Sequence, residues 1–112
     1  MGLFIKSQVL KVLFPFSDLS DAKKRPGLVI ATIDGDDTIL CQITSQNDEQ
    51  DPYAIPLISA DFEEGNLRQS SYIRPNKLFT ADPSIISGVI GYITQRKMDE
   101  VDTAIIRILQ SK

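Results

Sequence analysis

Helical periodicity is confined to one part of this chain, a segment from about residue 95 to residue 110. The apolar residues of this segment recur at the spacing of one helix face, and they are Met98, Val101, Ile105, Ile108 and Leu109. Upstream, the apolar runs are short, rich in β-branched residues and separated by turn-forming residues. Several short strands followed by one amphipathic helix predict a mainly β protein, a small antiparallel barrel or strongly curved sheet with a C-terminal helix. The apolar face of that helix has to be covered by its own sheet or by a second subunit.

The apolar runs place the strands, which are expected at residues 8–13, 27–33, 38–44, 53–58, 70–74 and 87–93. The second run is continuously apolar, as is typical of a strand buried on both faces. In the third run Cys41 lies on the same face as Ile39 and Ile43 and is expected to be a small core residue. Pro56 places the fourth strand at an edge or a bulge.

The connections are predicted from proline, glycine and polar residues. Residues 14–26, with proline at both ends and a basic cluster, are expected to form a long loop. Residues 61–66 should turn the chain, and Pro75 should end the strand that precedes it. Thr94 is expected to cap the C-terminal helix.

Length and composition predict one domain over residues 1–112 and exclude several classes of function. The chain is 42% hydrophobic, but no run approaches the ~20 apolar residues of a membrane helix. The apolar N-terminus is interrupted by lysines and lacks a small-residue cleavage site, so we expect no signal peptide and a cytoplasmic protein. One cysteine and no histidine argue against a disulfide framework, a zinc site and any histidine-based catalytic triad.

Charge is segregated along the chain, although the net charge is only −3. Residues 1–33 carry a net charge of +3 and residues 67–97 a net charge of +4, whereas residues 34–66 contain nine acids and no base. A basic face built from the first and third of these segments would bind a polyanion. On charge alone, ordinary solvated surface charge is the alternative.

Four segments carry a more specific pattern. In FPFSDLSDAKKRPGLVIA an Arg-Pro step opens an apolar strand, and in ILCQITSQ a Thr-Ser-Gln sequence ends the next one. SYIRPNKLFTADPSII and GYITQRKMDEVDTAI follow further on. In order and spacing these segments resemble the MazF/PemK (Kid) toxins over nearly the whole chain. One position departs from that family, which begins its first strand with a Gly-Asp pair after a basic residue, whereas here Lys6 is followed by Ser7 and Gln8.

The resemblance implies an SH3-like barrel of the MazF/CcdB type that forms a homodimer. It also implies a toxin of a type II toxin–antitoxin system, with a cognate antitoxin that occupies the RNA groove. The implied activity is cleavage of single-stranded messenger RNA at short motifs, with no metal or other cofactor. Its products would be a 2′,3′-cyclic phosphate and a 5′-hydroxyl. Carried over by position, the catalytic residues are Arg25 and Thr44.

The chemistry of these two residues fits that reaction. RNA supplies its own nucleophile, the 2′-hydroxyl, so the protein has to stabilise the charge of the pentacoordinate phosphorane. The planar guanidinium of Arg25 can contact two phosphate oxygens and stays charged at any working pH. Thr44 ends a strand and can donate its hydroxyl to the same phosphate. Taken alone, Arg25 would be read as a solvated loop residue, and Thr44 as the partner of a turn amide.

Further residues of the same segments are candidates for RNA binding. Aromatic side chains stack on unpaired bases, and basic side chains contact the phosphate backbone. Arg74, with Ser71 near it, lies where the family has an RNA-contacting arginine. The full set is Phe16, Lys23, Lys24, Ser45, Gln46, Ser71, Arg74 and Lys77. A core position for Phe16, and plain surface positions for Arg74 and Lys77, are the structural alternatives.

Two other functions compete with RNA cleavage. The same barrel type serves gyrase poisons of the CcdB kind, which are marked by a C-terminal tail that contains tryptophan, and this chain has no tryptophan. A non-catalytic RNA- or protein-binding module is the other alternative. It predicts binding without any cleavage.

Overall fold

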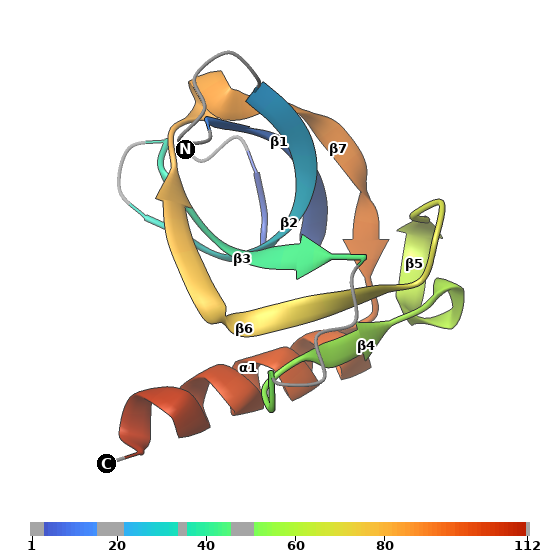
Figure 1. Ribbon diagram of the computed structural model, residues 1–112, viewed down its shortest axis with the longest axis vertical. Coiled ribbons are helices and arrows are strands. Elements are labelled where there is room, and N and C mark those ends of the chain that lie inside the picture. Colours follow the sequence, from blue (N-terminus) through green and yellow to red (C-terminus); the bar gives the residue numbers. More distant parts are fainter. Residues whose placement is uncertain (1–3, 16–21, 34–35, 46–50, 112) are drawn as a thin grey trace.

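The computed structural model describes residues 4–15, 22–33, 36–45 and 51–111. Within them, seven antiparallel strands form one sheet in the order β4-β6-β3-β2-β1-β7-β5. The elements are β1 (Gln8–Pro15), β2 (Ala22–Thr32), β3 (Thr38–Thr44), β4 (Ile55–Leu57), β5 (Phe62–Gly65), β6 (Ser71–Ala81), β7 (Ile86–Ile93) and α1 (Gln95–Gln110). The sheet curls into a half-barrel, and α1 lies outside it near β4 and β6 (Figure 1). The predicted mainly β fold with one C-terminal helix is therefore confirmed.

Two apolar clusters lie on opposite faces of the central strands. The neighbouring residues Leu28 and Val29 of β2 belong to different clusters, and so do Leu40 and Cys41 of β3. Both strands are thus buried on both faces, which explains the uninterrupted apolar run in β2. Cys41 is fully buried, as expected, and its burial raises the pKa of the thiol to about 12.

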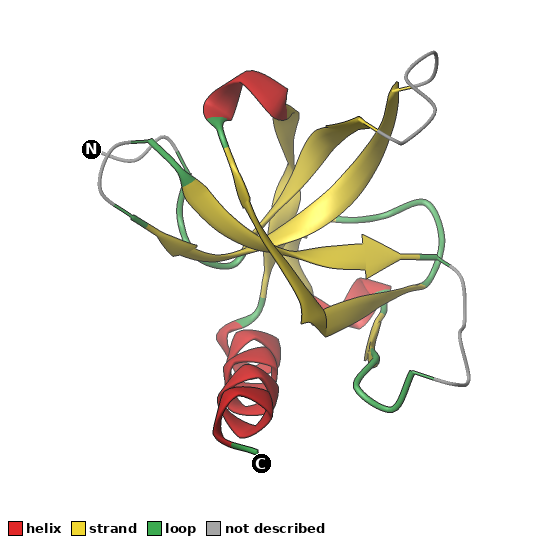
Figure 2. Cartoon of the chain, turned by 60° about the vertical axis from the view of Figure 1, so that its left-hand side comes forward, coloured by secondary structure: helices red, strands yellow, loops and turns green. Residues whose placement is uncertain are grey.

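The helix packs its apolar face on its own sheet, and it lies below the strands in the view of Figure 2. Met98, Val101 and Ile105 are buried in the cluster that contains Cys41, and the Thr94 hydroxyl accepts the Lys97 backbone N–H at 3.1 Å. Leu109 is 71% exposed, because the last turns of α1 extend past the sheet (Figure 1), so its own sheet covers only part of the predicted apolar face. In the described part of the chain, no helix is both long and apolar enough to cross a membrane.

Two predicted connections differ from the structure. Part of the expected loop 14–26 is a hairpin arm, because Phe14 and Pro15 pair with Lys23 and Ala22 through backbone hydrogen bonds that do not depend on apolar side chains. The expected turn at 61–66 contains the short edge strand β5, whose polar sequence conceals its pairing with β7.

β6 continues through Pro75, where the sequence predicted that a strand would end. Arg74 pairs with Gln42 and Leu78 pairs with the adjacent Cys41, so residues 75–77 bulge out of the ladder. A proline has no N–H to donate, and a bulge is a place in a sheet where none is required. Pro56 lies in the edge strand β4, as predicted.

Ser7 has a left-handed backbone, with φ of +82°. Its N–H donates to the Val29 carbonyl at 3.1 Å, and its carbonyl accepts from the Ile93 N–H at 3.0 Å. These bonds join β2 to the end of β7 and hold the residue in a conformation that favours glycine. The resemblance noted in the sequence would place a Gly-Asp pair here, so the departure from that pattern coincides with backbone strain.

We therefore expect Ser7→Gly to stabilise the protein by about 0.5–1 kcal/mol, because glycine reaches positive φ without a steric penalty. Unfolding in urea should show a higher midpoint with an unchanged slope. Ser84→Gly, at an exposed residue without positive φ, is the control and should not stabilise. An unchanged or lower midpoint for Ser7→Gly would show that serine at this position carries no net conformational penalty in the parent protein.

Candidate functional site

A cavity of about 440 Å³ opens where β2 and β3 approach the loop at residues 66–69. Both predicted catalytic residues, Arg25 and Thr44, line it. Arg25 comes from β2 and Thr44 is the last residue of β3, so residues 19 positions apart in sequence share one wall. β1, β6 and β7 supply further lining residues.

Strand register explains why these two residues meet. Gly27 of β2 pairs with Gln42 of β3, and the antiparallel register continued by two residues aligns Arg25 with Thr44. Side chains alternate along a strand, so Arg25, Thr44 and Gln42 lie on the same face of the sheet. The site is thus built on two strands whose inner ends are anchored in the apolar clusters.

The cavity is uniformly basic. Its charged lining residues are Lys11, Lys24, Arg25 and Arg68, and no acid is among the described residues that line it. Arg25 is partly buried and its Nε atom is fully buried, whereas Lys24 and Lys11 are exposed. A concave surface with one sign of charge concentrates polyanions, and a partly buried guanidinium interacts with a phosphate more strongly than a solvated one does.

The predicted RNA-binding residues divide into three groups. Lys24, Ser45 and Ser71 line the cavity, and the buried Ser71 donates its hydroxyl to the Gln69 carbonyl at 3.0 Å. Arg74 and Lys77 lie on β6 outside the cavity lining. Phe16, Gln46 and the side chain of Lys23 fall outside the described residues.

Arg74 forms an ion pair that the sequence did not indicate. Its Nε donates to Asp51 Oδ2 at 2.8 Å, and its Nη1 donates to Gln42 Oε1 at 3.4 Å. The Asp51 side chain is only 3% exposed, and its Oδ1 also accepts the Tyr53 backbone N–H at 3.0 Å. Burial of the carboxylate disfavours its charge, but the Tyr53 N–H and the Arg74 guanidinium outweigh that effect and lower the pKa of Asp51.

We expect Asp51→Asn to lower the free energy of unfolding by about 1–2 kcal/mol at neutral pH, because asparagine keeps an acceptor but loses the charge. The folded-state pKa lies below the unfolded one, so this stabilisation is present above about pH 3.9 and is lost as the pH falls through the folded-state value. Urea unfolding between pH 7 and pH 3 should show the two proteins converging in acid. A pH-independent difference would exclude the charged pair as its cause, and Glu63→Gln, at an exposed carboxylate, is the control.

Four polar lining residues were not predicted from the sequence: Lys11, Asn66, Arg68 and Gln69. Lys11 lies in the predicted strand 8–13, and it reaches the site because it pairs with Pro26, next to Arg25, in a segment that was predicted to be a loop. Arg68 is the first basic residue after the acidic segment 34–66, and this is the one feature of the sequence that indicates it as a site residue.

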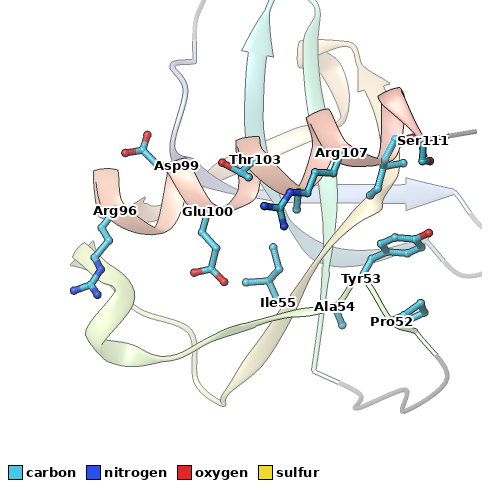
Figure 3. Close-up of a pocket in the computed structure, with 12 residues that line it drawn as sticks. Pro52, Tyr53, Ala54, Ile55, Arg96, Asp99, Glu100, Thr103, Arg107 and Ser111 are labelled. Carbon is cyan, nitrogen blue, oxygen red and sulfur yellow. Dashed lines mark hydrogen bonds between the residues drawn. The ribbon is translucent and has the colours of Figure 1, made fainter.

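A larger cavity, of about 770 Å³, lies between α1 and β4. Figure 3 shows Glu100 and Arg107 extending from the helix towards the strand that carries Ile55. Its charged lining residues are of both signs: Arg96, Asp99, Glu100 and Arg107. None of the residues predicted for catalysis or RNA binding lines it. Charge and residue type therefore favour the smaller, basic cavity as the functional site.

Comparisons with known proteins agree with the resemblance seen in the sequence. A mycobacterial endoribonuclease solved with its cognate antitoxin superposes with a TM-score of 0.74 at 14% identity, covering 96% of each chain. The Mycobacterium tuberculosis toxin MazF-mt6 gives 0.71 at 15% identity, covering 94% of this chain and 98% of its own. A second mycobacterial endoribonuclease gives 0.71 at 17% identity, covering 97% of this chain and 93% of its own.

At such low identities these structures establish the fold. No curated protein sequence matches the chain. The family model for PemK-like, MazF-like toxins of type II toxin–antitoxin systems matches residues 7–109. The match runs from Ser7 almost to the end of α1 and includes every residue of the basic cavity. The chain therefore belongs to the family of PemK-like, MazF-like toxins of type II toxin–antitoxin systems.

Proposed function

We propose that this toxin is an endoribonuclease that cuts single-stranded RNA without a metal ion. In the proposed reaction the 2′-oxygen forms a bond to the adjacent phosphorus, and the bond from phosphorus to the 5′-oxygen breaks. The 2′-hydroxyl gives up its proton and the departing 5′-oxygen takes one up. The products are a 2′,3′-cyclic phosphate and a 5′-hydroxyl. Because messenger RNA is the expected substrate, the toxin would act in the cytoplasm.

The placement of Arg25 and Thr44 in one basic cavity carries this proposal. In the proposed role, Arg25 holds the non-bridging oxygens of the scissile phosphate and stabilises the charge that grows on them in the transition state. The Thr44 hydroxyl donates to the same group, and Lys11 and Lys24 attract the backbone on either side. The family membership and the fold shared with proteins described as endoribonucleases support the same activity.

The decisive experiment incubates the purified protein with a long single-stranded RNA in excess EDTA and maps the ends that form. Discrete cuts with 5′-hydroxyl ends are the expected result. RNA binding without cuts would instead support a non-catalytic RNA-binding module. An absence of both cutting and binding would direct attention to a protein target.

Two partners belong to the proposal, a second copy of the chain and a cognate antitoxin. The core face of α1 is already covered by the sheet, but Ile106 and Leu109 on the same helix remain more than half exposed. Exposed apolar residues on one element favour a protein contact. We expect light scattering at micromolar concentration to give the mass of a dimer. A monomer mass would contradict the proposed dimer but not the proposed RNA cleavage.

A further inference from the structure

The loop at residues 66–69, between β5 and β6, forms one wall of the basic cavity and is held at both ends. Asn66 Nδ2 donates to Ser59 Oγ at 2.7 Å, and Asn66 Oδ1 accepts the Leu67 N–H at 2.9 Å. At the other end the Gln69 carbonyl accepts the hydroxyl of buried Ser71. These bonds fix the backbone of the loop. They do not involve the side chains of two loop residues that line the cavity.

Those residues are Arg68 and Gln69, which are both exposed and both line the cavity. Within the described part of the chain, neither side chain makes a hydrogen bond or an ion pair. An exposed guanidinium and an exposed amide on a fixed backbone thus belong to the lining of the cavity that Arg25 and Thr44 also line.

These two groups have the chemistry for reading bases. A guanidinium can make two hydrogen bonds to one edge of guanine, and a glutamine amide can do the same with adenine. In single-stranded RNA the Watson–Crick and Hoogsteen edges are open to such contacts. A cavity of about 440 Å³ lies within the usual ~300–1,000 Å³ of small-ligand sites and suits a single splayed-out nucleotide.

We propose that Arg68 and Gln69 read a base beside the scissile phosphate and so determine part of the motif at which this toxin cuts RNA. This inference rests on the proposed endoribonuclease function. A phosphate contact by Arg68 is the competing role, and it would raise affinity equally for every sequence. The fixed loop favours base reading, because discrimination between bases requires donors and acceptors with defined positions.

The test maps 5′-hydroxyl ends produced from a random-sequence single-stranded RNA pool by the parent protein, Arg68→Ala, Arg68→Lys and Gln69→Ala. For each variant, we expect the preference for one base at one position of the motif to fall by about tenfold. Arg68→Lys is the informative variant, because it keeps the charge but loses the planar fork. Ser70→Ala, at the next exposed residue and outside the cavity lining, is the control and should keep the motif.

Three outcomes would overturn the inference. One is an unchanged motif in all three variants while the parent cuts normally. The second is slower cutting of every sequence alike, together with a weaker salt dependence of RNA binding. If the slope of log affinity against log salt falls by about one for Arg68→Ala but not for Arg68→Lys, then Arg68 contacts a phosphate. The third is a parent protein that cuts no RNA, which refutes the proposed function and this inference with it.

Discussion

Replacing Arg25 by alanine is expected to reduce RNA cleavage by about 100- to 1,000-fold while the protein stays folded. The magnitude is typical for loss of one pre-positioned donor that stabilises transition-state charge. Arg25 is partly buried in the cavity wall and belongs to neither apolar cluster, so truncating it removes charge and hydrogen bonds but little core packing. Single-turnover cleavage of a mapped RNA, with circular dichroism of both proteins, measures the two effects separately.

Arg25→Lys is the matched variant, because it keeps the positive charge without the planar fork. We expect it to lose more than tenfold in rate, whereas Arg96→Ala, on α1 and outside the basic cavity, should cut at the parental rate. Thr44→Val tests the second group. If both residues act on one phosphate, the double variant should lose less than the product of the single losses. Parental cleavage by Arg25→Ala would remove Arg25 from the mechanism.

The sequence predicted the parts of the site that lie inside continuous patterns. β3 was predicted to the residue, because its apolar sequence lies between two polar segments rich in turn-forming residues. The placement of Arg25 and Thr44 in one cavity followed from the family resemblance, and the strand register now gives a physical reason for it.

The remainder of the site depends on contacts between segments that carry no local pattern. Lys11 joins the cavity because β1 pairs with the start of β2, which was predicted to be a loop, and Arg68 lies in the loop after β5, a strand that was predicted to be a turn. Their strands pair through backbone atoms alone, so polar sequences such as that of β5 give no alternation to detect. The Asp51–Arg74 ion pair spans 23 positions and could not be inferred from composition.

Glycine at position 91 is expected to be essential for the position of β5 and of the loop 66–69, which forms one wall of the basic cavity. Gly91 in β7 pairs with Gly65, the last residue of β5, which has φ of +82°. A Cβ built on Gly91 would overlap the Glu64 carbonyl oxygen and crowd the Gly65 Cα, and both obstacles are backbone atoms. β5 would therefore have to move away from β7, and the loop that begins at Asn66 would move with it.

Gly91→Ala should consequently destabilise the protein by about 2–3 kcal/mol, as overpacking against a fixed backbone does. For a chain of this length that corresponds to a melting temperature lower by roughly 10 °C. Gly88→Ala is the matched control on the same strand, because nothing lies within 4 Å of a Cβ built there, and it should change stability by less than about 0.5 kcal/mol. Equal melting temperatures for the two variants would refute the close approach of β5 and β7.

If Gly91→Ala also cuts RNA slowly well below its melting temperature, and Gly88→Ala does not, then the position of β5 controls the cavity as well as the fold. That result would follow from the geometry, since Gly65 is covalently joined to the loop whose residues line the cavity opposite the paired ends of β2 and β3.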